Sequence, residues 1–166
     1  MPDITKIKRS AFAHYLNTTP TAQSPTWVRV GYTTSGTYSL NPQTEVEQYI
    51  KDDSSTTSVT GYQPSIDNPL VAHKGEPIFE YVHTLFKNRS IGSECETEVL
   101  FVDIFDASGT SSVTYGAQKN KCTIVVTDMG GDAGANVVLN FDININGDPV
   151  IGTATISNGT PTFTEA

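Results

Sequence analysis

The sequence predicts a mainly β protein of the α+β class, an antiparallel two-sheet β-sandwich or barrel with one flanking α-helix. The first observation is composition: hydrophobic residues make up 37% and charged residues 17%, and Thr, Ser, Asn, Gly and Pro are frequent, as in strands joined by turns. The second is order, since β-type runs surround one run of helical period. The third is the length of 166 residues, which predicts a single domain, 1–166, with a core of its own.

Residues 1–24 are expected to form an extended arm. The stretch "NTTPTAQSP" (Asn17–Pro25) is polar and interrupted by prolines, which is unfavourable for a core element. Strands are then expected at Thr26–Thr33, which places Trp27 in the core, and at Gly36–Leu40.

A long hairpin is expected over residues 44–67. Two β-type runs, "TEVEQYI" and "TSVTGYQPSI", flank the polar tip Lys51–Thr57. Helix is the alternative for the first run, whose apolar residues fit both periods. A hairpin with apolar flanks and a hydrophilic tip cannot bury itself on a small domain. It is therefore expected to contact a neighbouring subunit through Tyr49, Ile50, Asp52, Asp53, Val59, Tyr62 and Ile66.

The stretch Pro77–Arg89, "PIFEYVHTLFKNR", predicts the helix. Proline is favourable at the first helical position. Ile78, Val82 and Leu85 recur at helical spacing and are expected to face the core. One helix among many strands is expected to cover a sheet.

The remaining strands are expected on either side of a Gly-rich link, "MGGDAGA", with a tight turn at Asn146–Gly147. Their expected ranges are Cys95–Phe105, Val113–Gln118, Lys121–Asp128, Asn136–Asn146 and Val150–Ser157.

The run Asn136–Asn146, "NVVLNFDININ", alternates between apolar and polar residues. Successive strand side chains point to opposite faces, so one face is apolar and the other is almost entirely Asn and Asp. Asn is depleted in strands, which makes this polar face unusual. Two interpretations remain open: an ordinary solvated face, or a wall along which a polyanion slides without binding.

The stretch "DININGD" (Asp142–Asp148) also has the spacing of the first half of an EF-hand calcium loop. A complete loop needs a bidentate Glu at its twelfth position, where this chain has Thr153, and helices on both sides. No metal site or cofactor is therefore expected.

The charge of −8 argues against nucleic-acid binding through a basic face. His14, His73 and His83 are scattered, no catalytic motif occurs, and no enzymatic activity is expected. Cys95 and Cys122 lack metal spacing and are expected to be small buried thiols, although neighbouring strands would permit a disulfide. No signal peptide or apolar membrane span is visible, so synthesis and assembly in a cytoplasm are expected.

Three stretches carry a resemblance to a known family: "TWVRVGYTTSGTYSLNPQTEVEQYIKDDSSTTSVTGYQPSID", "KGEPIFEYVHTLFKNRSIG" and "EVLFVDIFD". Together they resemble the tail tube (major tail) proteins of long-tailed bacteriophages, most of all those of phages of Gram-positive hosts. The resemblance covers Trp27–Asp106. Its most specific pieces are the Asn-Pro-x-Thr-Glu entry to the hairpin, the "VTGYQPSID" exit and the Gly-Glu-Pro start of the helix.

The resemblance implies a structural virion protein whose subunits form hexameric rings. In such rings the sheets join into one closed barrel, and the rings stack into a tube that carries DNA to the host. A tape measure protein and a tail terminator are the implied partners, and DNA passes without specific binding. The expected lumen-lining residues are Asn140, Asp142, Asn144, Asn146, Thr153 and Thr155. The alternatives are a carbohydrate- or receptor-binding β-sandwich module and the tube of a phage-like bacteriocin.

Overall fold

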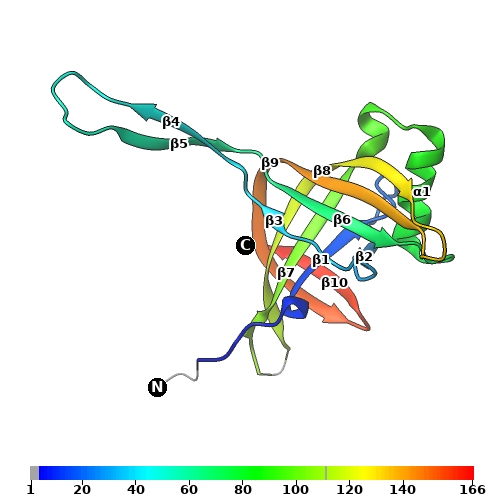
Figure 1. The fold of residues 1–166 in the computed structure, drawn as a ribbon. Helices are drawn as coiled ribbons and strands as arrows, with labels where there is room; N and C mark the ends of the chain where they lie inside the picture. Colours follow the sequence, from blue (N-terminus) through cyan, green and yellow to red (C-terminus); the bar gives the residue numbers. More distant parts are fainter. Residues whose placement is uncertain (1–3, 111) are drawn as a thin grey trace.

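The computed structural model describes residues 4–110 and 112–166, and strands dominate this part of the chain (Figure 1). An α-helix, α1 (Pro77–Asn88), and two short 3-10 turns, η1 (Arg9–Ala11) and η2 (Gly92–Cys95), accompany them. The strands are β1 (Phe12–Asn17), β2 (Trp27–Arg29), β3 (Tyr38–Ser39), β4 (Pro42–Glu47), β5 (Thr56–Tyr62), β6 (Ser65–Val71), β7 (Glu96–Ser108), β8 (Thr114–Gly130), β9 (Val138–Ser157) and β10 (Thr160–Glu165).

The main sheet is antiparallel and has the strand order β2-β1-β7-β8-β9-β6-β3, with β10 paired to the C-terminal half of β9. Its two ends approach each other. The ring of Tyr38 in β3 lies 4.7 Å from that of Phe101 in β7. His14 Nε2 of β1 lies 3.1 Å from Asn68 Oδ1 of β6. The sheet therefore curls into two packed layers, as the predicted sandwich requires, and α1 flanks it (Figure 1).

The two faces of the sheet bury two apolar clusters, because successive strand side chains point to opposite faces. The first cluster fills the space between the curled layers and α1, and it includes Leu16, Ile66, Leu70, Phe101, Ile124, Leu139, Phe141 and Ile143. The second lies on the other face, against β10, and consists of Ala13, Tyr15, Trp27, Leu100, Val102, Ala117 and Ala154. Trp27 is therefore a core residue, as predicted.

The ends of α1 are set by local chemistry. Pro77 occupies the first turn, where its missing N–H costs nothing. The Glu76 carboxylate accepts a hydrogen bond of 2.6 Å from the backbone N–H of Phe79, which satisfies one of the free donors of that turn. After Asn88 the chain enters the left-handed region at Arg89 (φ 49°), which ends the helix.

The first part of the chain differs from the sequence-based expectation. The prediction of an extended arm over residues 1–24 is wrong for Phe12–Asn17, which form β1 between β2 and β7. This strand is buried on both sheet faces, so its sequence lacks the alternation of a half-buried strand. The buried Asn17 Oδ1 accepts hydrogen bonds from the backbone N–H groups of Thr19 (3.0 Å) and Thr26 (3.1 Å). The polar loop is therefore fixed to the body.

The long strands β8 and β9 also differ from the expectation. The predicted turn at Asn146–Gly147 is wrong, because β9 continues through it alongside β8. Asn146 pairs with Lys121 and Val150 with Lys119, so residues 147–149 bulge opposite residue 120. Gly147 has the positive φ (67°) that a bulge or a turn can use equally. The two expected strands over 113–128 are likewise one strand, β8.

The chain turns back at a second Asn-Gly pair instead. Asn158 (φ 50°) and Gly159 (φ 80°) both adopt positive φ, as a two-residue hairpin turn requires, and connect β9 to β10. β10 was not predicted from the sequence.

The predicted long hairpin exists, but its boundaries shift from 44–67 to 42–62. β4 and β5 pair with each other in a two-stranded sheet that projects from the body (Figure 1). This excludes the helical alternative for β4. Residues Ser65–Val71 form β6 and belong to the main sheet.

Leu85→Ala is expected to lower the free energy of unfolding by ~2–5 kcal/mol, because it removes a large side chain from a packed core. Ile78 and Val82 are fully buried on the same helix face, and Leu85 is 8% exposed. Urea denaturation measures the loss. Val46→Ala, on the exposed hairpin, is the matched control and should change stability little. A Leu85→Ala variant as stable as the parent would contradict this packing.

Candidate functional site

The polar face of β9 is the first candidate surface. Leu139, Phe141, Ile143 and Ile145 are buried in the first cluster, whereas the residues between them point to the opposite sheet face. There Asn140, Asp142 and Asn144 are partly exposed and Asn146 is exposed. We call these four residues and their polar cross-strand neighbours the polar face; these neighbours are Ser65 and Asp67 of β6 and Lys121, Thr123 and Asp128 of β8. The apolar Pro69 and Val125 pair with Asn140 and Asp142.

Hydrogen bonds between strands hold the side chains of the polar face in place. Asn140 Nδ2 donates to Asp128 Oδ1 at 2.6 Å. Asn146 Nδ2 donates to Thr123 Oγ1 at 2.8 Å. Each of these two amides is thus bonded to a side chain of β8. The surface along β9 is hydrated and has no long side chains. This explains physically how a strand tolerates so many Asn residues.

Thr153 and Thr155 do not belong to the polar face. Directly paired residues of neighbouring strands lie on the same face, and Thr153 pairs with Gly116 while Asn146 pairs with Lys121. Gly116 and Lys121 are five residues apart in β8, so they point to opposite faces. The expectation that all six predicted residues share one surface is therefore wrong for the two threonines. The assumed turn at Asn146–Gly147 caused the error.

Cross-strand pairing brings charged side chains of neighbouring strands beside the polar residues of β9, and the sequence of β9 alone does not show them. Lys121 lies opposite both Asn146 and Glu98. Lys119 Nζ lies 3.7 Å from Glu98 Oε1. The segment from Cys122 to the end of the chain has no Lys or Arg, but the neighbouring strand brings two lysines beside it. These lysines lie next to carboxylates, so the surface as a whole remains far from basic.

Asp67 and Asp142 are directly opposite each other across β6 and β9. Burial, and then the negative charge of Asp67, raises the pKa of Asp142. Within the described residues, no Lys, Arg or His forms a salt bridge with either carboxylate. In the same part of the chain, no three His, Cys, Asp or Glu side chains gather closely enough to hold a metal ion. Asp142, Asn144 and Asn146 lie along an extended strand, whereas a calcium loop curls around its ion.

The projecting hairpin is the second candidate surface. Its exposed apolar side chains are unusual for a soluble surface: Ile50 is fully exposed, and Tyr49, Val59 and Tyr62 are each more than half exposed. Asp52 and Asp53 are exposed at the tip. Such a segment is typical of a surface that is covered by a partner.

Ile66 does not belong to the hairpin surface. The prediction that it contacts a neighbouring subunit is wrong, because Ile66 is fully buried in the first cluster and pairs with Ile143. The chain re-enters the main sheet at Ser65, just after the hairpin ends.

The residues with potential for catalysis are placed for packing. His14 is buried, and this burial lowers its pKa to about 4, so the ring is neutral at physiological pH. His83 stacks on Phe79 of the helix. Burial raises the pKa of Cys122 to about 12, which makes it a poor nucleophile. Cys95 and Cys122 are free thiols.

No family model matches the chain, and no curated protein matches it in sequence. Solved structures do match its fold. A chain in the C6-symmetric tail of an empty gene transfer agent (GTA) particle has a TM-score of 0.64 and 12% identity, over 88% of this chain and 98% of that chain. The fold is one found in phage-like tails.

Two further solved structures contain chains of similar fold. A chain in the virion of a native GTA particle has a TM-score of 0.56 and 11% identity, over 88% of this chain and 98% of that one. A chain in the sixfold-symmetrised baseplate of the anti-feeding prophage (AFP) has a TM-score of 0.50 and 13% identity, over 91% of this chain and 97% of that one. At these identities the similarity concerns the fold. No helix in the described ranges is long and apolar enough to cross a membrane.

Asp142→Asn is expected to raise the free energy of unfolding at pH 7 by ~0.2–1 kcal/mol, the range of other cross-strand pairs. The pKa of Asp142 is raised in the folded state, so its ionisation costs stability above the ordinary carboxyl range and the cost disappears as the pH falls. The advantage of the variant should therefore vanish near pH ~3. Urea denaturation at both pH values measures it, with the exposed Asp148→Asn as the control. A variant less stable than the parent at pH 7 would contradict the repulsion.

Proposed function

We propose that this chain is a structural tail tube protein that self-assembles into stacked hexameric rings, which form the conduit for DNA delivery in a phage or phage-like virion. The observation that carries the proposal is the similarity of its fold to a chain of a C6-symmetric tail, over nearly the whole of both chains. A head-to-tail contact between identical subunits closes into a ring when the rotation between them divides a full turn. The projecting hairpin gives each subunit a segment that reaches beyond its own body.

The polar face is the proposed wall of the channel. A protein that makes about 6–10 contacts with DNA phosphates binds DNA ~10³–10⁵-fold more tightly at low salt than at moderately higher salt. A basic wall repeated over many rings would therefore hold the genome. Asn140, Asn144 and Asn146 offer short amides instead of cations, and Asp67 and Asp142 make this part of the wall acidic. Thr153 and Thr155 lie on the other face and are not part of the proposed wall.

A tube of this kind would enclose a tape measure protein during assembly and would end at a tail terminator. A second candidate is the tube of a phage-like bacteriocin. The similarity to a chain of the AFP baseplate favours it. The DNA content of purified particles distinguishes the two candidates. A carbohydrate-binding module would need an exposed aromatic platform, and the indole of Trp27 is buried.

Negative-stain electron microscopy of the purified protein at high concentration tests the assembly. Rings or tubes are expected for the parent chain. Deleting residues 52–56, the hairpin tip, should leave a folded monomer that polymerises poorly, because the deleted segment makes no packing contact with the core in the isolated subunit. A parent protein that stays monomeric would overturn the proposal. Equal polymerisation of parent and deletion variant would remove the hairpin from the assembly contact.

Replacing Asn140, Asn144 and Asn146 with Lys is expected to make the tubes retain DNA at low salt and to slow DNA ejection. The buried face of β9 is unchanged by these substitutions, so folding should survive. Co-sedimentation of tubes with linear DNA at increasing salt measures retention, which should fall steeply as salt rises.

The matched control is the replacement of Thr160, Thr162 and Thr164 by Lys, which adds the same charge at exposed positions of β10. Thr162 pairs with Thr155 and Thr164 with Thr153, so these side chains lie on the opposite sheet face. Equal ejection rates for both triple variants, or a density map with Asn140 and Asn144 on the outside of the tube, would exclude the proposed wall.

A further inference from the structure

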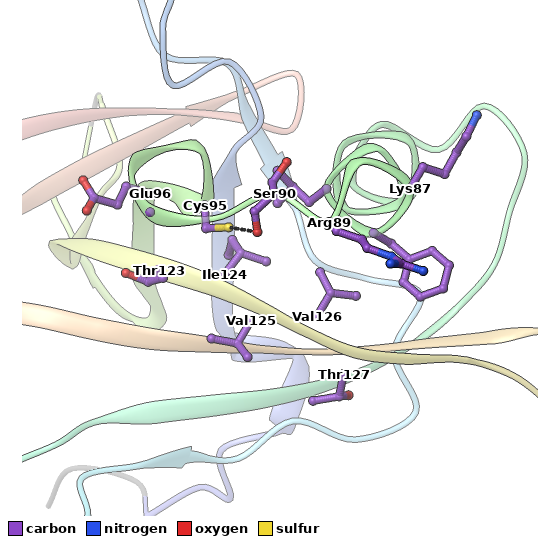
Figure 2. A pocket seen from close by; sticks show the side chains of 13 residues that line it. Lys87, Arg89, Ser90, Cys95, Glu96, Thr123, Ile124, Val125, Val126 and Thr127 are labelled. Atoms are coloured by element: carbon purple, nitrogen blue, oxygen red, sulfur yellow. Dashed lines mark hydrogen bonds between the residues drawn. The ribbon is translucent and has the colours of Figure 1, made fainter.

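A groove of about 750 Å³ lies between the C-terminal end of α1 and β8. Its size is within the ~300–1,000 Å³ range of pockets that hold a drug-sized molecule. Figure 2 shows Lys87 and Arg89 on the helix side of the groove and Val125, Val126 and Thr127 on the β8 side. We call this the helix-end groove.

The floor of the helix-end groove is an open sheet edge. The pairing of β7 with β8 ends at Glu96 and Thr123, because η2 leads the chain away just before β7 begins. β8 continues to Gly130 and pairs with β9 on its other side. Within the described residues, no strand pairing occupies the β7 side of β8 beyond Thr123. An unpaired edge of this kind presents backbone donors and acceptors to an incoming strand.

The helix end of the groove is basic and apolar, whereas its other end carries the exposed carboxylate of Glu96. Lys87 and Arg89 are exposed, and Arg89 stands at the helix end in the left-handed conformation. Phe86 and Val125, which both line the groove, are each 40% exposed. The whole chain has only 10 Lys and Arg against 18 Asp and Glu, so two adjacent cations beside exposed apolar side chains form a distinctive surface.

The projecting hairpin has the complementary chemistry. It carries Glu45, Glu47, Asp52 and Asp53 against a single cation, Lys51. Its apolar side chains are uncovered, and Ile50 is fully exposed. The turn is held by the bond from the Asp52 N–H to the Tyr49 carbonyl (2.9 Å), so little ordering is needed before docking. The outer edges of β4 and β5 are also unpaired in the described chain.

The hairpin cannot fill the groove of its own subunit. It leaves the body at the end of the sheet away from α1 (Figure 1). A contact between these two surfaces therefore joins different copies head to tail, which is the geometry that builds rings and stacks.

We propose that the helix-end groove is the receptor for the β4–β5 hairpin of a second copy of this chain. Lys87 and Arg89 face its acidic side chains, the exposed apolar residues of the two surfaces cover each other, and the open edge of β8 accepts a hairpin strand. The inference rests on the proposed tail tube function and names the contact through which the subunits assemble.

Charge reversal in two separate variants tests the contact. One variant carries Lys87→Glu with Arg89→Glu, and the other carries Asp52→Lys with Asp53→Lys. Each alone is expected to raise the concentration needed for polymerisation at least tenfold, measured by sedimentation and electron microscopy. Mixing the two proteins should restore assembly, because the reversed hairpin of one then meets the reversed groove of the other. The four substitutions combined in one chain should also restore it.

The control carries Lys6→Glu with Lys8→Glu, the same charge change at exposed positions near the N-terminus, and should assemble like the parent. Thermal melts of the monomers check that every variant is folded. If the parent forms tubes and the groove variant assembles equally well, the docking contact is overturned and the proposed function still stands. Failure of the mixture to assemble better than either variant would overturn it as well. A parent that never assembles would overturn both proposals.

Discussion

The rest of the structure depends on the pairing of β8 with β9. These two strands run side by side for most of their lengths, 17 and 20 residues. The other edge of β8 accepts β7, and the other edge of β9 accepts β6 in its first half and β10 in its second. Both apolar clusters therefore build on the same strand pair, one on each face. The bulge at residues 147–149 keeps the pair continuous while the chain bends.

This arrangement explains how a small protein has both a closed core and a large polar surface. The curled end of the sheet buries one face of the first half of β9, and α1 seals that cluster. β10 covers the opposite face only beside the second half of β9, so the first half remains open there. The Asn and Asp side chains occupy this uncovered region. Their short amides bond to side chains of β8, which keeps this part of the surface hydrated.

The projecting hairpin and the open edge of β8 are both unfavourable features in an isolated monomer. Exposed apolar side chains and unpaired strand edges promote association, and natural proteins usually cover them or place charges on them. Here the charges differ in sign between the two surfaces, acidic on the hairpin and basic beside the helix end. Opposite charges steer the two surfaces together, and the like charges of two hairpins disfavour their pairing with each other.

Local patterns in the sequence determined several features of this protein. The alternation in "NVVLNFDININ" fixes which side chains of β9 face the core, because a strand offers only two faces. The proline start and the apolar spacing identify α1, because an amphipathic helix has its own period. The fold class follows from the order of these elements. The hairpin is visible because its two runs are adjacent in the chain.

The tertiary structure decided what depends on distant partners. The chain has two Asn-Gly pairs in β9 and beyond, at 146–147 and 158–159, and both offer positive φ. The first becomes a bulge because β8 continues alongside it, and the second becomes a turn because β8 has ended. That choice sets the face of Thr153 and Thr155. β1 gives no periodic signal because both its faces are buried, and Ile66 enters the core because β6 pairs with β9. The partner strand determines each of these features, and no local sequence pattern identifies that partner.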